Sequence, residues 1–222
     1  MQINPTCVER NEPKKTKRTI GRISRLIAMR IPFLLSILLI GNQAFAEEIT
    51  FDMSVWGFTF GQMVVTKTME NDSTELYTLN ASGKVNFLWM KKEGSTSYAV
   101  RFREGKMLSS SYSRTVNGEM EYWNEVAFDG EKYSVESSKG NRDFTEIPEY
   151  TVLALYFDPV VDHERIYCEA ETEFSNVTSR STKGFELSCT DGSKTSYHLK
   201  EGQIEMLEIH ASLANVKMKR VN

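Results

Sequence analysis

Histidine is the first residue type to consider for chemistry, because its imidazole binds metals and exchanges protons near neutral pH. The three histidines, His163, His198 and His210, are widely separated, and no His-x-His or His-x-x-x-His pair occurs. Each stands beside charged or polar residues, as is typical of solvent-facing positions. The sequence therefore predicts no metal site. A hydrolase with an unrecognised site is an alternative, and it would require folding to gather these histidines with carboxylates within hydrogen-bond reach.

Nucleophilic and phosphate-binding motifs are also missing from the sequence. It has no Gly-x-Ser-x-Gly elbow and no Ser-x-x-Lys with the motifs that support it. The Gly-x-x-x-Gly motif at 57–61 lacks the lysine of a phosphate loop. Carboxylates spaced by two, such as Glu119 and Glu121, describe the solvated face of a strand. We therefore expect a non-enzymatic protein with no catalytic residues and no cofactor.

Two cysteines, Cys168 and Cys189, follow the N-terminal segment 1–46, which we predict to be a cleaved export signal, and the third, Cys7, lies inside that segment. An even number of cysteines in an exported chain predicts a disulfide. Closing a loop of about 22 residues would stabilise the fold by about 3 kcal/mol on the chain-entropy model. A redox pair is the alternative, although that function prefers a Cys-x-x-Cys spacing.

Aromatic side chains concentrate between Trp56 and Trp123, and they are the remaining feature with functional potential. Inside a β-barrel such residues form either a packed core or a cavity for an apolar ligand. Trp56 and Trp123 lie on faces opposite their apolar neighbours, which indicates a partner-binding surface or burial under a helix. The candidates for contact with a ligand or partner are Trp56, Phe58, Phe60, Trp89, Phe102, Tyr112 and Trp123.

Alternation of apolar and polar residues indicates the elements that position these side chains. Ile49, Phe51, Met53 and Val55 share one face of a predicted strand, and similar patterns recur along the chain. Asn-Gly and Asp-Gly pairs between the patterns favour tight hairpin turns. The sequence therefore predicts a mainly β fold, a single antiparallel meander of ten or so strands curled into a barrel or half-barrel that hides its edges.

One segment, Ile147 to Phe157, departs from the alternation. Pro148 stands where a helix would begin, and Asp158-Pro159 would end it. We predict a short helix at 147–157 that plugs or covers an open side of the curled sheet. A buried strand is the alternative.

The N-terminal segment has the three parts of a secretory signal. Lysines and arginines precede an apolar run, Ile31 to Ile40, and Ala44-Phe45-Ala46 gives a small-x-small cleavage site before Glu47. We predict a signal peptide at 1–46, cleaved after Ala46, and a periplasmic product; a start at Met29 would leave the same compartment.

The apolar run would rise about 15 Å as a helix, half of a bilayer core of about 30 Å. We therefore expect no stable membrane span after processing. No cysteine follows the run that could carry a lipid anchor.

The mature chain, 47–222, has a size that suits one domain. Eight of the 27 basic and two of the 30 acidic residues lie in the leader, so 19 basic and 28 acidic residues remain, a net charge of −9. An acidic surface disfavours nucleic acid as a partner.

Short motifs across the domain carry a resemblance. A strand at 49–55, the Gly-x-x-x-Gly turn at 57–61, a strand at 63–69, a central helix at 148–156 and a late strand at 202–207 occur in this order. In this the chain resembles a family of exported bacterial envelope proteins of unknown function. The resemblance implies a curled β-sheet in the periplasm, no established activity and no defined catalytic residues.

The leading hypothesis is a periplasmic protein that binds or carries an apolar small molecule inside the curled sheet. The alternative is a cell-envelope interaction or scaffold protein that uses exposed strand edges and Trp56 or Trp123.

Overall fold

The computed structural model describes residues 46–87, 90–159, 163–190, 192–210 and 215–221. The predicted signal peptide lies outside these ranges, apart from its final residue, Ala46. Ala46 and Glu47, which flank the predicted cleavage point, begin the first strand and pair with Thr68 and Lys67. Ala44 lies outside the described residues. Within the described ranges, no helix has the length and apolar content needed to cross a membrane.

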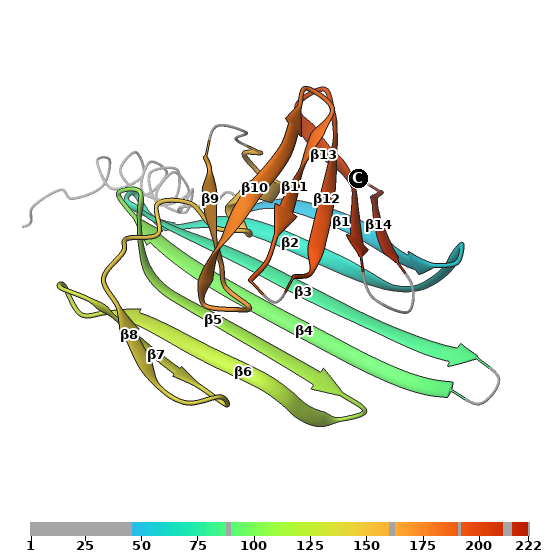
Figure 1. The fold of residues 1–222 in the computed structure, drawn as a ribbon, viewed down its shortest axis with the longest axis horizontal. Helices are drawn as coiled ribbons and strands as arrows, with labels where there is room; N and C mark the ends of the chain where they lie inside the picture. The colour runs from blue at the N-terminus through green and yellow to red at the C-terminus, as the bar shows by residue number, and fades with distance from the viewer. Residues whose placement is uncertain (1–45, 88–89, 160–162, 191, 211–214, 222) are drawn as a thin grey trace, which may run out of the picture. The chain divides into compact units, whose positions relative to one another are not determined.

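The described part of the chain forms one antiparallel sheet of 14 strands (Figure 1). The strands are β1 (Ala46–Val55), β2 (Phe58–Asn71), β3 (Thr74–Phe87), β4 (Met90–Arg103), β5 (Lys106–Val116), β6 (Glu119–Phe128), β7 (Tyr133–Ser137), β8 (Arg142–Phe144), β9 (Arg165–Cys168), β10 (Glu173–Ser181), β11 (Gly184–Ser188), β12 (Lys194–Lys200), β13 (Gln203–His210) and β14 (Val216–Arg220).

Strands that follow one another in sequence pair with each other, except β8 and β9, and the first and last strands, β1 and β14, also pair. The order across the sheet is therefore β8 to β1, then β14 back to β9, so β1 and β14 lie in its middle. β8 and β9 form the two edges, and the sheet curls without closing between them (Figure 1). The predicted single meander, curled into a half-barrel, is confirmed.

Inner-face residues of the curled sheet make the core. Alternation places Phe51, Val65 and Leu79 on this face, and Phe51 and Val65 have no exposed surface. Most outward residues are polar, so one face is buried and the other solvated, as antiparallel sheets allow.

The predicted helix at 147–157 is wrong: its only helical part is a 3-10 turn, η1 (Ala154–Tyr156). The reason is that the backbone before η1 pairs with the edge strand β9. Val152 N–H donates to the carbonyl of Tyr167 at 3.0 Å, and Tyr167 N–H donates to Tyr150 at 3.0 Å. Those groups are therefore not available to a helix.

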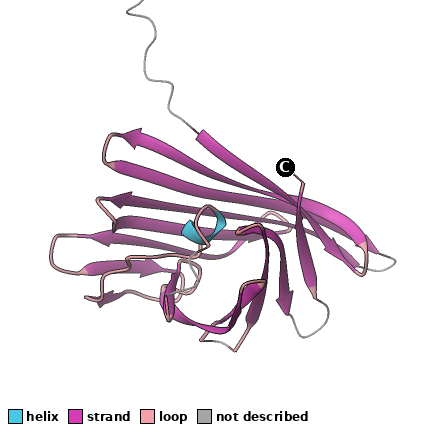
Figure 2. Ribbon diagram, turned by 90° about the horizontal axis from the view of Figure 1, so that it is seen from above, coloured by secondary structure: helices cyan, strands magenta, loops and turns pink. Residues whose placement is uncertain are grey.

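The segment nevertheless plugs the curl, as predicted. Figure 2 shows η1 on the concave side of the sheet. Leu153 and Leu155 are fully buried, and the Tyr156 ring packs edge-on against Phe51 at 5.7 Å between ring centroids. Residues 150–157 are called the plug below.

Candidate functional site

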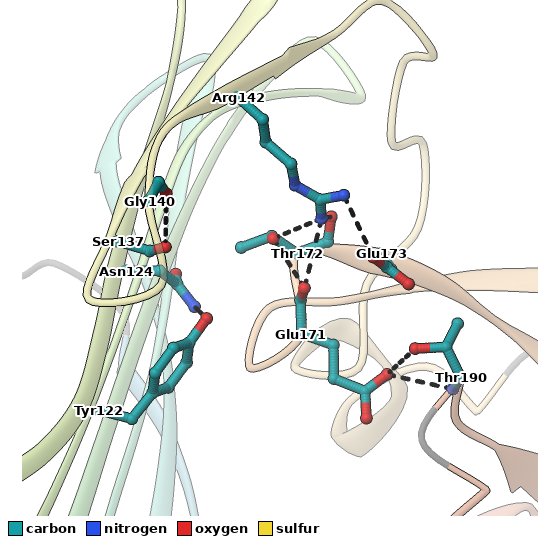
Figure 3. A network of polar contacts seen from close by, with 9 residues as sticks. All are labelled: Tyr122, Asn124, Ser137, Gly140, Arg142, Glu171, Thr172, Glu173 and Thr190. Atoms are coloured by element: carbon teal, nitrogen blue, oxygen red, sulfur yellow. Dashed lines mark hydrogen bonds and ion pairs between the residues drawn. The ribbon is translucent and has the colours of Figure 1, made fainter.

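A seam of polar contacts joins the two sheet edges (Figure 3). Arg142 on β8 donates from Nη2 to the carbonyl and the hydroxyl of Thr172, at 2.6 and 2.7 Å, and from Nη1 to Glu173 at 3.1 Å. Asn124 Nδ2 on β6 donates to the carbonyl of Glu169 at 2.9 Å. Side-chain contacts, rather than backbone hydrogen bonds between β8 and β9, therefore bridge the gap between the two edges of the sheet.

A cavity of about 590 Å³ lies between the plug and the inner face of the sheet. Its size falls in the range of small-molecule sites. Apolar side chains from both halves of the sheet line most of it, including Met53, Met63, Leu79, Tyr112, Leu207 and Met218.

The cavity becomes more exposed toward the hairpin end of β3 and β4. Leu79 and Tyr112 are buried at its deep end, whereas Lys92 and Arg114 at the other end are exposed. The inner-face partners across β3 and β4, from deep to open, are Leu79 with Tyr98, Ala81 with Thr96, Gly83 with Gly94, and Val85 with Lys92. The open end is called the mouth below.

Cys168 and Cys189 line the same cavity, because β9 and β11 flank β10. Their sulfur atoms and a carboxylate oxygen of Glu171 lie within 4.8 Å of one another. The predicted disulfide is nevertheless not formed in this structure, where both residues are free thiols. A hydrogen bond from Cys168 lowers the pKa of Cys189 to about 7. The same hydrogen bond, and to a smaller extent burial, raises the pKa of Cys168.

A carboxyl group, that of Glu169, is fully buried beside the plug. Its Oε1 accepts the N–H of Leu153 at 3.0 Å, which ties the plug to the end of β9. Burial raises the pKa of Glu169 to about 7. Its Oε2 and Asn124 Oδ1 have no hydrogen-bond partner among the residues that the structure places. No periodic signal in the sequence distinguishes Glu169 from the neighbouring surface glutamates.

Comparison with known proteins defines the family. Residues 51–221 match the model of a domain of unknown function, DUF6134. The chain belongs to the DUF6134 family. The predicted resemblance is thus confirmed as far as a family of unknown function with a curled β-sheet, while an envelope location stays a prediction.

The DUF6134 domain is also similar to a solved structure, a β-barrel-like protein of another domain of unknown function, DUF1849, from Brucella abortus. The TM-score is 0.53 at 10% identity, and the match covers 81% of this chain and 96% of that chain. At this identity the likeness concerns the fold alone. No curated protein shows significant similarity to this chain.

The seven aromatic candidates do not form one site in the DUF6134 domain. Phe60 and Tyr112 line the cavity. Phe102 is buried in the core, edge-on to Tyr77. Trp56, Phe58 and Trp123 are exposed outside the cavity, and Trp89 lies outside the described residues.

The β1–β2 turn explains the exposure of two of these candidates. Trp56 and Gly57 both have positive φ, 50° and 83°, as a tight two-residue hairpin turn requires. The turn projects Trp56 and Phe58 into solvent, 67% and 71% exposed.

Several cavity residues of the DUF6134 domain were not among the predicted contact residues, including Met53, Leu79 and Tyr156. Strand alternation shows that Met53 and Leu79 face inward, but it does not show which strands converge on a cavity.

The histidines lie on separate elements of the DUF6134 domain. His163 stacks on Tyr150 of the plug, at 4.8 Å between ring centroids. His198 is exposed on β12, and His210 on β13 shares a hydrogen bond of 2.9 Å with Ser196. Across the placed residues, the cluster of possible metal ligands is the one formed by Cys168, Cys189 and Glu171, which contains no histidine.

Proposed function

We propose that this domain is an exported, non-enzymatic protein that binds and carries an apolar small molecule in the periplasm. The observation behind the proposal is the cavity of about 590 Å³ inside the curled sheet, with its mostly apolar lining. Export is supported by the leader sequence, with its basic start, short apolar run and Ala44-Phe45-Ala46 site.

The lining supplies the affinity in this proposal. Burying a methylene group of a ligand contributes about 0.8 kcal/mol. Met53, Met63 and Met218 in the wall have flexible, polarizable side chains that adapt to ligands of different shapes. Such a site selects by volume and polarity, as a carrier requires.

Binding of Nile red, a fluorescent apolar probe, tests the proposal. The full-length chain is expressed in a bacterium, and its product is purified from the envelope. Ala81→Phe fills the cavity from the inner face of β3, and we expect it to weaken binding by about tenfold, which is about 1.4 kcal/mol. Asn80→Phe, on the exposed outer face one residue earlier, is the control and should bind as the wild type does. Non-saturable binding to the wild type, or equal losses in both variants, would contradict the proposal.

The proposed periplasmic location also predicts a disulfide between Cys168 and Cys189. In an oxidising periplasm Cys168 and Cys189 would each lose a proton and an electron to a thiol oxidant and form one S–S bond. Intact mass should then be two hydrogen masses below the dithiol value, and N-terminal sequencing should begin at Glu47. Retention of the leader, or two thiols that react with a maleimide in the unfolded product, would argue against this location.

An envelope interaction protein is the second candidate function. It is favoured by the exposed Trp56 and Phe58 at the β1–β2 turn, since aromatic residues anchor many interfaces. Crosslinking in the periplasm should capture a discrete partner that is lost in a Trp56→Ser, Phe58→Ser double variant. Unchanged capture by the double variant would exclude this surface.

A further inference from the structure

We infer that the ligand is a single-chain amphiphile with an anionic head, its chain in the apolar depth of the cavity and its head at Lys92. This inference rests on the proposed function and adds the chemical class of the ligand.

The first support is the gradient of polarity along the inner face. Leu79 and Tyr112 bury the deep end, and Lys92 lies at the mouth on the same face of the β3–β4 pair. Gly83 and Gly94 pair between these positions, and the Phe60 ring lies against Gly83. A strip of small, mostly apolar residues therefore leads from the deep end to one cationic group, Lys92.

The second support is the pairing of the other charges around the cavity. Arg114 at the mouth binds Glu121 at 2.8 Å. Glu93 forms an ion pair of 3.3 Å with Lys84, its cross-strand neighbour. Both residues lie on the outer face of the β3–β4 pair, opposite to Lys92.

The remaining carboxylate in the wall, Glu171, accepts the hydroxyl and the N–H of Thr190 at 3.0 and 3.2 Å. For Lys92, by contrast, no carboxylate of the described ranges lies within ion-pair distance. Lys92 is thus a cation that faces an apolar cavity in a domain whose overall charge is strongly negative.

The chain and the head make separate contributions to affinity. Each added methylene that enters the cavity should raise affinity by about fourfold. The ion pair with Lys92 forms at an exposed mouth, so it should raise affinity by about fivefold in total, less than the combined effect of the methylenes of the chain.

Calorimetry below the critical micelle concentration tests the head and the chain independently. The ligands are myristate, myristyl alcohol and myristyltrimethylammonium, together with the shorter acid laurate. We expect myristate to bind about fivefold more tightly than the alcohol and the cationic amphiphile to bind most weakly. Lysophosphatidic acid with the same chain is included, because a preference for it over myristate would identify a lipid rather than a free acid as the source of the anionic head.

Two neighbouring lysines provide matched variants. Lys92→Met should abolish the preference for myristate over the alcohol, whereas Lys91→Met, on the opposite face of β4, should retain it. Equal affinity of the alcohol and the acid for the wild type, or the same loss in both variants, would overturn the inference while leaving the carrier function intact. If no amphiphile binds, or if chain length has no effect, the carrier function itself fails.

Discussion

Glu169 carries a carboxyl group in the interior of the domain. Its carboxyl is fully buried, accepts the N–H of Leu153 and has a pKa raised to about 7. In the folded state it keeps its proton at pH values where the unfolded chain has lost it. The contribution of this group to the free energy of unfolding should therefore fall by about 3 kcal/mol as pH rises from about 4.5 to about 7, and it should stay constant above that pH.

Glu169→Gln should remove that fall. The amide carbonyl can still accept the N–H of Leu153, and it has no charge to bury, so the variant should gain stability over the wild type above pH 7. Urea unfolding of both proteins at pH 4.5 and pH 8 measures this. Parallel pH profiles of the two proteins would show that folding does not raise the pKa of Glu169.

The glycines of the inner face show how one atom decides whether two strands can pack. A Cβ on Gly61 would lie 2.2 Å from the carbonyl oxygen of Ser82, whereas a Cβ on Gly94 would meet nothing nearer than 3.5 Å. We expect Gly61→Ala to destabilise the fold by about 3 kcal/mol and Gly94→Ala by much less. Thermal unfolding of the pair checks this, and equal midpoints would contradict it.

At the scale of elements, the seam between β8 and β9 depends on Arg142. Its guanidinium donates to two acceptors on Thr172 and one on Glu173, so removing it leaves partly buried oxygens unpaired. Arg142→Met should cost about 2 kcal/mol and increase hydrogen exchange in β9. Lys84→Met, which removes an exposed ion pair with Glu93, is the control and should cost less than about 1 kcal/mol. Equal exchange in the two variants would show that the seam does not depend on Arg142.

The hairpins and the plug differ in how far the sequence predicts them. The hairpins could be predicted because Asn117-Gly118 and similar pairs fix the turns, and alternation then assigns each side chain to a face. The plug could not, because Pro148 and Pro159 mark the ends of a segment without showing what pairs with it. Its backbone contacts to Tyr167 depend on where β9 lies in the folded sheet. The cavity could not be predicted for the same reason: Met53 and Leu207 line it together although they lie far apart in the sequence.

At the scale of the whole domain, β1 and β14 hold the two halves of the sheet together. β14 pairs with β1 through five residues of each strand, from Phe51 with Arg220 to Val55 with Val216. Deleting residues 216–222 should expose unpaired edges on β1 and β13, and we expect the protein to aggregate. Size-exclusion chromatography of the shortened chain measures this, and a monomeric, folded product would contradict it.

The pairing of β1 with β14 also affects the order in which the sheet can fold. Ser54 and Lys217 touch although 163 residues separate them in sequence. Contacts of such separation form slowly, because a long loop must close before it gains any interaction. The ribosome makes β1 first, and β1 can pair with β2 at once, but its other edge has no partner until β14 is made. Until β14 is made, the incomplete chain therefore exposes an unpaired edge of β1, which makes it prone to aggregation.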